Sequence, residues 1–351
     1  MNKRILIAPL NWGLGHAARC IPIIEELINH NFEPIIGSDG NALSLLKKEF
    51  PNLQTFELPS YNVNYSKKGT YLKLKLISNI PSIAIAIKNE NNFIKKFVKT
   101  HNIDGVISDN RLGLYCKQVP CVIMTHQLNV LSGNTTYLST KLHQKFINKF
   151  DECWVPDFKG DKNLSGILGH PKKISVSKKY IGPLSRFNKI STEIKHDLLV
   201  LLSGPEPQRS LLENKLLAEL KKYKGNIVFI KGKIESVQKV NVENHITIYN
   251  YMTTSELEKT INKSQLVLSR SGYTTIMDLA KLEKKAFFIP TPGQYEQIYL
   301  AKKLHEDGIA PFCLQENFTV EKLNEVKQHK GFKDSENHTN FKNLFSLFER
   351  E

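Results

Sequence analysis

Cysteine is scarce in this sequence, and the few cysteines form no recognisable site. The five are Cys20, Cys116, Cys121, Cys153 and Cys313. Their number is odd, they are scattered, and no two of them form a C-x-x-C pair. This set excludes a disulfide framework and gives no zinc-binding pattern, so it fits a reducing compartment.

Long apolar runs are also absent. The longest mostly apolar stretch, residues 77–87, is far too short to span a bilayer and contains Pro81. The chain begins MNKRILIAPLNW and enters a predicted strand without the apolar core of a signal peptide. We therefore predict a cytoplasmic location, with neither a leader nor a membrane-spanning helix.

Acidic residues are under-represented in the first half of the chain. The 351 residues carry a formal net charge of +15. Residues 1–185 hold 24 lysines and arginines against 13 acidic residues, whereas residues 186–351 hold 25 against 21. Within the first half, residues 67–99 contain eight lysines and a single acid, Glu90. The excess of positive charge is therefore local, and it calls for a local explanation.

Three interpretations fit the basic stretch 67–99: an ordinary helix face, a nucleic-acid patch, or a surface that docks on anionic lipid. A merely solvated face would not need the leucines and isoleucines that accompany the lysines in YLKLKLISNIPSIAIAI. Nucleic-acid binding would be better supported by arginines, aromatic residues and a known module, and we find none. The composition favours an anionic membrane surface over nucleic acid, and an amphipathic core helix remains the alternative.

Two successive series of strands alternate with helical segments, and 351 residues are about right for two domains. Apolar runs predict strands at 3–9, 33–37, 53–58, 105–108, 121–124 and 153–155, and then at 198–203, 226–230, 246–249, 266–269 and 286–289. Gly182 and Pro183 interrupt the pattern and predict a bend between domains. The alternation predicts two doubly wound α/β domains, 1–182 and 183–340, followed by a short amphipathic helix at 341–351.

The stretch 265–301 contains two strand-to-helix turns, one at Ser271 and Gly272 and one in a Pro-rich segment. Open α/β sheets bind ligands at this edge, and the N–H groups that begin such a helix attract anions. Thr274 and Asp278 are four residues apart and share a helix face, where an acid can hold a ribose hydroxyl. Two ordinary capping turns are the alternative interpretation.

The motif S-R-x-G-x-x-T-x-x-[DE], followed by the Pro-rich turn and a polar pair, resembles the nucleotide-sugar half of GT-B glycosyltransferases. It is most similar to the MurG-like enzymes of glycosyltransferase family 28. The resemblance implies two Rossmann-like domains that face a central cleft, and a C-terminal helix, 341–351, that crosses back to the first domain. It also implies that Ser271 and Gly272 face the diphosphate, that Asp278 holds the ribose, and that Glu296 and Gln297 grip the sugar. The family has glutamate where this chain has Asp278.

Residues 13–18, GLGHAA, satisfy G-x-G-x-x-[GA], and Asp39 follows the next strand, so a dinucleotide site is one interpretation. A histidine at the helix start favours another use, because a pyrophosphate-binding helix packs small residues there. The loop resembles the first glycine-rich loop of MurG-type enzymes, which faces the acceptor. His16 is the leading candidate for the general base, because a neutral imidazole at a helix N-terminus can accept a hydroxyl proton near neutral pH, and a capping histidine is the alternative. The acceptor-side loop then comprises Trp12, Gly13 and Gly15.

Two further polar groups follow strands of the first domain. Asp109 ends the strand 105–108 at the same sheet edge as His16. In several GT-B families an aspartate at this place orients the catalytic histidine, although an ordinary turn aspartate is an equal alternative. His126 lies where the family has a His-Glu-Gln run, so the resemblance leaves the choice of base between His16 and His126 open.

The loop 202–209 takes the place of the family's second glycine-rich loop, but two prolines remove N–H groups that would hold phosphate. The resemblance then implies that only a few remaining groups bind the diphosphate. They are Arg186, Ser203, Gly204, Arg209 and Arg270. A structural ion pair is the alternative for Arg270.

No D-x-D motif occurs in the chain. Enzymes that hold a sugar diphosphate through a metal commonly use such paired carboxylates, whereas GT-B enzymes rely on helix dipoles and basic side chains. We expect no metal and no cofactor besides a UDP-sugar donor. The implied reaction is inverting transfer, by analogy of N-acetylglucosamine, to a lipid or lipid-linked acceptor at the inner face of the plasma membrane. A UDP-sugar epimerase of the same fold and a non-catalytic, membrane-docked partner of a transferase are the alternatives.

Overall fold

The computed structural model describes residues 2–61, 80–233, 235–333 and 339–349. These residues form two compact units, and each is described by itself. Unit 1 holds the described residues of 1–64, 73–185 and 336–351, and unit 2 holds those of 186–335. The division after residue 185 lies close to the predicted boundary at 182, and the C-terminal helix is part of unit 1.

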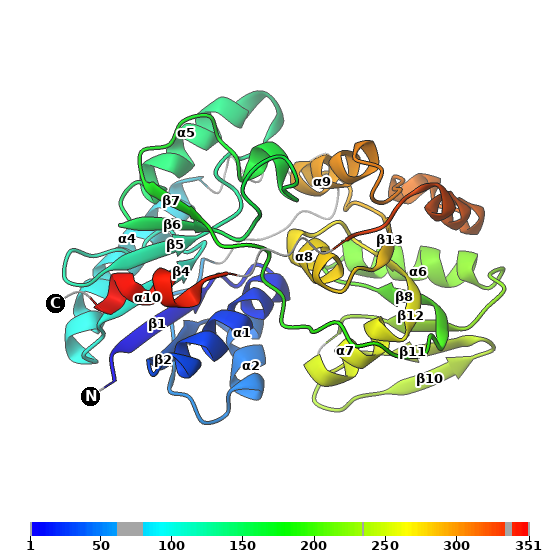
Figure 1. The fold of residues 1–351 in the computed structure, drawn as a ribbon, viewed down its shortest axis with the longest axis horizontal. Helices are drawn as coiled ribbons and strands as arrows, with labels where there is room; N and C mark the ends of the chain where they lie inside the picture. Colours follow the sequence, from blue (N-terminus) through cyan, green and yellow to red (C-terminus); the bar gives the residue numbers. More distant parts are fainter. Residues whose placement is uncertain (1, 62–79, 234, 334–338, 350–351) are drawn as a thin grey trace. The chain divides into compact units, whose positions relative to one another are not determined.

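Unit 1 is built on a seven-stranded sheet with the order β3-β2-β1-β4-β5-β6-β7, in which every neighbouring pair is parallel (Figure 1). The strands are β1 (Arg4–Pro9), β2 (Glu33–Ser38), β3 (Thr55–Glu57), β4 (Gly105–Asp109), β5 (Cys121–Met124), β6 (Glu152–Val155) and β7 (Ser177–Tyr180). The helices are α1 (Leu14–Asn29), α2 (Gly40–Glu49), α4 (Ile80–Thr100), α5 (Thr136–Ile147) and α10 (Phe341–Glu349). The central strands are apolar runs because both faces of the sheet are covered.

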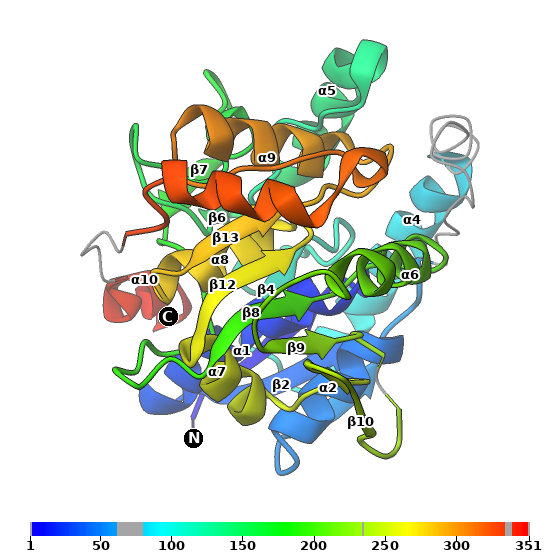
Figure 2. The ribbon, with the colours of Figure 1, turned by 90° about the vertical axis from the view of Figure 1, so that its right-hand side faces the viewer.

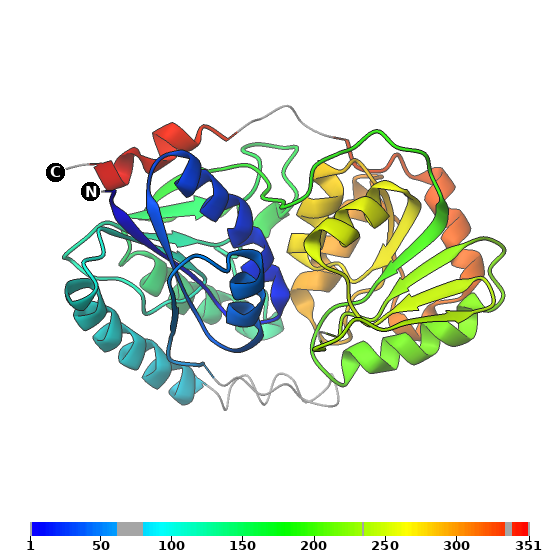
Figure 3. The same cartoon turned by 90° about the horizontal axis from the view of Figure 1, so that it is seen from below.

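Helix α10 covers part of unit 1, and its end lies beside the start of β1 (Figures 1 and 3). Its four buried side chains are Leu344, Phe345, Leu347 and Phe348. The Phe345 ring meets the edge of Phe32 with 5.7 Å between centroids, and Lys3 Nζ donates to the Phe348 carbonyl at 2.8 Å. The apolar residues of this short helix therefore share one face, and that face closes the core near the N-terminus of β1.

Unit 2 has a six-stranded sheet with the order β10-β11-β9-β8-β12-β13, and Figure 2 shows its central strands. The strands are β8 (His196–Leu201), β9 (Ile227–Ile230), β10 (Val240–Glu243), β11 (Ile246–Tyr249), β12 (Ser264–Ser269) and β13 (Lys285–Phe288). The helices are α6 (Gln208–Leu220), α7 (Thr254–Asn262), α8 (Tyr273–Lys281) and α9 (Tyr295–Glu306). All neighbouring strands are parallel except the hairpin β10–β11.

Each sheet has one place where the order of strands reverses direction. In unit 1 the chain runs outward from β1 to β3 and then returns to β4 on the other side of β1. In unit 2 it runs outward from β8 and returns to β12 on the other side of β8. The loops that leave the carboxyl ends of such neighbouring strands diverge, and ligands of α/β proteins bind between them. The fold therefore predicts one ligand site after β1 and β4 and another after β8 and β12.

Candidate active site

The loop between β1 and α1 carries the predicted base of unit 1. Gly13 caps α1 with a φ of 81°, a left-handed conformation that favours glycine. In the part of the chain that the structure describes, no atom other than those of its chain neighbours lies within 4 Å of the place where a Cβ on Gly13 would stand. His16 lies in the first turn of α1 with its side chain 14% exposed, after Gly15, and Trp12 is partly exposed beside the loop. The loop thus presents a histidine beside open space.

Asp109, at the end of β4, pairs in register with Pro9 at the end of β1, and this places it beside the loop. His16 Nδ1 lies 3.1 Å from Asp109 Oδ1. Arg19 donates to both oxygens of the fully buried carboxyl, through Nε to Oδ2 at 2.7 Å and through Nη2 to Oδ1. Burial alone would raise the pKa of Asp109, but the charges and hydrogen bonds of Arg19 and His16 outweigh it and lower the pKa to about 2. Asp109 is therefore a carboxylate at any physiological pH.

His126, which follows β5, joins the same group. Its side chain is buried, and its Nδ1 lies 3.1 Å from Arg19 Nη1. The structure thus brings together the three predicted catalytic residues His16, Asp109 and His126. They meet around Arg19, which the sequence did not single out. Arg19 follows His16 by three residues on α1, and this helical spacing was the signal that could have found it.

Asp39, the acid that a dinucleotide interpretation would assign to a ribose, is used otherwise. It is buried after β2, where it accepts from Arg111 Nη1 at 2.8 Å and from Asn11 Nδ2 at 3.2 Å. Arg111 also donates to the buried Glu90 at 2.6 Å. Asp39 therefore belongs to an internal ion-pair network that supports the loops after β1 and β4, and its placement does not favour a dinucleotide site.

In unit 2, the turn between β12 and α8 offers open space. Ser269 at the end of β12 pairs with Leu201 at the end of β8, so this turn lies at the reversal of strand order. Gly272 caps α8 with a φ of −72°, a conformation that any residue adopts. Apart from its chain neighbours, no atom of the described residues lies within 4 Å of the place where its Cβ would stand. What Gly272 provides is access to the N–H groups of α8.

Helix α8 turns one face to the core and another toward this open turn. Ile276, Met277 and Leu279 are buried, whereas Thr274 and Asp278 are only partly buried. The carboxyl of Asp278 lies on the second turn of the helix, four residues after Thr274 and on the same face. This placement is compatible with the predicted contact of Asp278 to a ribose, which stays a prediction.

The Pro-rich turn and the β12–α8 turn are joined by hydrogen bonds. Ser271 Oγ donates to the carbonyl of Gln297 at 2.7 Å, and the N–H of Thr291 donates to Gln297 Oε1 at 2.8 Å. Gln297, one member of the predicted sugar-binding pair, thus binds the side chain of Ser271 in one turn and the backbone of Thr291 in the other. Glu296 lies beside it in the first turn of α9 and is partly exposed. The predicted sugar contacts of Glu296 and Gln297 remain predictions.

Two of the arginines expected at the diphosphate are buried in unit 2, where they bind neighbouring parts of the chain. Arg270 donates to the carbonyls of Ile289, Pro290 and Gln208 and to Gln315 Oε1, at 2.7–3.1 Å. All four acceptors are neutral, so Arg270 has no carboxylate among them, and burial lowers its pKa to about 10. Its placement favours a structural role over the predicted contact with phosphate.

Arg209, on the first turn of α6, is likewise buried and bound by two carboxylates. It donates to Glu213 at 2.7 Å and to Glu206 at 2.9 Å. The other members of the expected set differ: Ser203 and Gly204 are exposed, and Gly204 has a φ of 106° with open space around it. Donor contacts in this loop are therefore better expected from its backbone than from Arg209.

Arg186, the remaining arginine of the expected set, follows the division between the units. Its Nη1 donates to Thr254 Oγ1 at 3.0 Å, and its guanidinium lies 5.0 Å from the centroid of the Phe187 ring. Thr254 begins α7, so Arg186 is held near the carboxyl end of β11. Its predicted contact with the diphosphate stays a prediction.

Known proteins share both the sequence pattern and the fold. The model of the glycosyltransferase family 28 C-terminal domain matches residues 208–349. The UDP-N-acetylglucosamine–N-acetylmuramyl-(pentapeptide) pyrophosphoryl-undecaprenol N-acetylglucosamine transferases of Haemophilus ducreyi and Clostridium tetani are 23% and 25% identical. The first match covers 93% of this chain and 90% of the relative, and the second covers 100% and 98%. The crystal structure of MurG from Acinetobacter baumannii matches with a TM-score of 0.55 and 14% identity over 99% of this chain and 92% of that one.

The chain is a glycosyltransferase of the GT-B fold, and it is similar to the enzymes of family 28.

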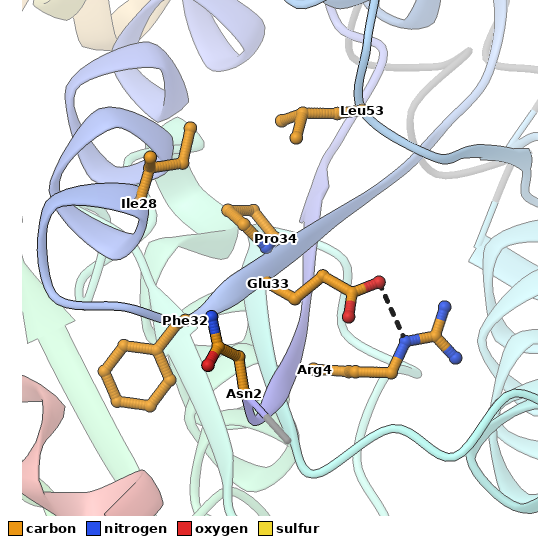
Figure 4. A pocket seen from close by; sticks show the side chains of 7 residues that line it. All are labelled: Asn2, Arg4, Ile28, Phe32, Glu33, Pro34 and Leu53. Atoms are coloured by element: carbon orange, nitrogen blue, oxygen red, sulfur yellow. Dashed lines mark hydrogen bonds and ion pairs between the residues drawn. The ribbon is translucent and has the colours of Figure 1, made fainter.

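A hollow in unit 1 lies away from this site, and the basic lysines of the glycosyltransferase lie outside the described residues. A shallow hollow lies at the amino ends of β1 and β2, where Arg4 pairs with Glu33 at 3.2 Å (Figure 4). That edge is opposite to the one that carries His16 and Asp109. The lysines at 67, 68, 73 and 75, on which the membrane interpretation rests, lie outside the described residues. No helix of the described part is long and apolar enough to cross a membrane.

Proposed function

We propose that this glycosyltransferase moves a sugar, N-acetylglucosamine by analogy, from a UDP-sugar to a hydroxyl of a lipid or lipid-linked acceptor at the inner face of the plasma membrane. The observation that carries the proposal is the contact of His16 Nδ1 with the buried carboxylate of Asp109 at 3.1 Å. A carboxylate at Nδ1 orients the imidazole and stabilises the imidazolium that forms when Nε2 takes a proton. This is what a general base for an acceptor hydroxyl requires.

The reaction is an in-line displacement at the anomeric carbon. The acceptor oxygen gives its proton to His16 Nε2 and bonds to the anomeric carbon, while the bond from that carbon to the diphosphate oxygen breaks. UDP leaves with the electron pair, and the configuration at the carbon inverts. The N–H groups that begin α8, left open at Gly272, would receive the negative charge of the leaving diphosphate.

The proposal is tested by incubating the whole protein with labelled UDP-N-acetylglucosamine and a bacterial lipid extract. We expect label in the lipid phase, in EDTA as well as in magnesium, because helix N–H groups and basic side chains take the place of a metal. Turnover that EDTA abolishes and manganese restores would contradict the metal-free step. A changed sugar still bound to UDP would identify an epimerase, and an absence of any turnover would leave the non-catalytic alternative.

The donor site is tested separately through Asp278. Replacing Asp278 by alanine is expected to weaken UDP binding by about 1–3 kcal/mol, because a charged hydrogen bond to the ribose is lost. The measurement is isothermal titration with UDP. Glu306→Ala is the matched control, since Glu306 is an exposed acid that pairs with Lys302 on the helix surface. Equal UDP affinity in the Asp278 variant and the control would remove Asp278 from the site.

Membrane docking is supported by exposed apolar side chains on α5. Tyr137 and Leu138 are 74% and 70% exposed, and Lys141 lies 5.4 Å from the centroid of the Tyr137 ring. Apolar residues that insert beside lysines suit an anionic bilayer, where each lysine contributes on the order of 1 kcal/mol. The surface proposed to dock therefore includes α5 in addition to the basic stretch 67–99.

We expect sedimentation with anionic vesicles that falls steeply with salt, because the Debye length is about 8 Å at physiological ionic strength. Neutral vesicles should bind little. Tyr137→Ser with Leu138→Ser, and Lys67, Lys68, Lys73 and Lys75 changed together to Glu, should each reduce binding while UDP affinity stays unchanged. The control replaces the exposed Val240 and Val242 of β10 by serine. Parent-like sedimentation of both test variants would contradict the membrane assignment.

A further inference from the structure

Two of the five thiols meet where the loop after β4 enters β5. Cys116 lies in this loop and is partly exposed, whereas Cys121 begins β5 and is buried. Their sulfur atoms are 3.8 Å apart, and the N–H of Cys116 donates to Cys121 Sγ at 3.4 Å. The pair lies at the amino end of β5, opposite to the sheet edge that His126 follows. The proposed sugar transfer therefore gives these two thiols no role.

The backbone of Cys121 is held on both sides, while that of Cys116 has room to adjust. The N–H of Cys121 donates to Asp151 Oδ2 at 2.7 Å, and its carbonyl accepts from the N–H of Asp151 at 2.9 Å. Asn91 of α4 holds the loop up to the carbonyl of Tyr115, at 2.7 Å, and Cys116 follows outside any helix or strand. A disulfide bond is about 2 Å long, so the sulfurs must approach by roughly 1.8 Å. A turn of the Cys116 side chain, with a small shift of its loop, supplies this without a change in the sheet.

The surroundings make Cys116 the more reactive of the two thiols. A hydrogen bond from the Cys121 thiol lowers the pKa of Cys116, and burial opposes this effect. Backbone N–H groups of Gln118 and Val119 also stabilise the thiolate and lower the pKa, while the charge of Asp151 raises it. The hydrogen bond to Cys116, followed by burial, raises the pKa of Cys121, which therefore keeps its proton. Because the thiolate is the form that attacks oxidants, Cys116 is the nucleophile of the pair.

The other three cysteines, which also lie in the described residues, differ from Cys116. All three are buried. Burial raises the pKa of Cys153 to about 12 and that of Cys313 to about 11. Burial, together with the carboxylate of Asp109, raises the pKa of Cys20. Buried thiols of this kind are inert, so the exposed face of Cys116 and the second sulfur beside it set this pair apart.

We propose that Cys116 and Cys121 form a redox-active dithiol, a modification site at which a hydroperoxide closes a disulfide between them. The Cys116 thiolate attacks one peroxide oxygen and becomes a sulfenic acid as the O–O bond breaks. The hydroxide that leaves becomes water with the proton that the Cys116 thiol had released. Cys121 sulfur then attacks Cys116 sulfur, the S–O bond breaks, and the second hydroxide leaves as water with the Cys121 proton. The two sulfurs lose two electrons, and the peroxide gains them.

The first test treats the reduced whole protein with hydrogen peroxide, alkylates the remaining thiols, and digests the protein with trypsin without reduction. Trypsin cleaves after Lys117, so the two cysteines fall in separate peptides, 112–117 and 118–141. A disulfide between them appears in the mass spectrum as one linked species that dithiothreitol separates. We expect this species to form about tenfold or more faster than N-acetylcysteine is oxidised in the same solution. A linked species no faster than this free thiol, or Cys116 linked to another cysteine or a second copy, overturns the proposal.

The second test replaces Cys121 by serine, which keeps the nucleophile and removes the thiol that completes the bond. Dimedone, which reacts with sulfenic acids, should then label peptide 112–117 about tenfold or more above the parent, because nothing consumes the sulfenic acid. Cys313→Ser is the matched control, since it removes a buried thiol outside the pair and should leave the linked species unchanged. Parent-like dimedone labelling in Cys121→Ser overturns the proposal. If Cys121→Ser does not fold, the linked species in the parent decides. Neither test uses sugar transfer, so a failure of the proposed function leaves this proposal standing.

Discussion

Replacing His16 by glutamine is expected to lower kcat for sugar transfer by about 10²–10⁴-fold, the usual contribution of a positioned general base. Glutamine retains a polar side chain of similar size but cannot take up the acceptor proton. In the proposed function UDP binds in unit 2, so its affinity should not change. The thermal midpoint should shift little, since His16 is partly exposed at a helix start and Asp109 keeps its bidentate partner Arg19.

His126→Gln is the matched control for this result. Both histidines contact Arg19, and both replacements exchange an imidazole for an amide. His16 Nδ1 contacts the carboxylate of Asp109, whereas His126 Nδ1 contacts the Arg19 guanidinium, so the loss in kcat should be at least tenfold smaller for His126→Gln than for His16→Gln. Initial rates under saturating donor and acceptor provide the measurement. A larger loss in His126→Gln than in His16→Gln would exchange the two assignments.

The sequence was a good guide to strands that lie inside the sheets and to the edge strands β3 and β13, but it missed two other edge strands. The interior strands are continuous apolar runs, such as β4 and β5, because both faces are covered. β7 (SKKY) and β10 (VNVE) were not predicted. Each is the last strand of its sheet, where solvent replaces one neighbour and polar residues are tolerated. Their missing apolar signal is a consequence of their position.

The approach of His16 to Asp109 was predictable because parallel strands end at one edge, and the order of β1 and β4 followed from the doubly wound pattern. Arg19 was not predicted, since an arginine on a helix usually faces solvent, whereas here the carboxylate of Asp109 compensates for its burial. Arg209 and Arg270 show the opposite case. Their positions next to predicted turns suggested ligand contacts, but Arg209 binds carboxylates of its own segment and Arg270 binds carbonyls of other segments.

Asp109 should also carry a large part of the stability of unit 1 through its pairing with Arg19. Its pKa is about 2 in the folded protein against an ordinary value of 3.8, so its contribution is complete above about pH 4 and is lost as the pH falls toward 2. This difference corresponds to about 2 kcal/mol of unfolding free energy. The sign follows from the lowered pKa, because the unfolded chain binds the proton more tightly than the folded one.

Replacing Asp109 by alanine is expected to cost more, about 3–5 kcal/mol at neutral pH, because it leaves the Arg19 charge buried without a partner. Both tryptophans, Trp12 and Trp154, lie in unit 1, so urea unfolding followed by tryptophan fluorescence reports on this unit.

The double variant Arg19→Met with Asp109→Leu removes both charges and should recover at least half of the loss. Asp104→Ala, which removes a carboxylate that accepts from the exposed N–H of Arg4, is the control and should cost less than about 1 kcal/mol. A loss in Asp109→Ala no larger than in that control would mean that the buried pair does not hold the site together.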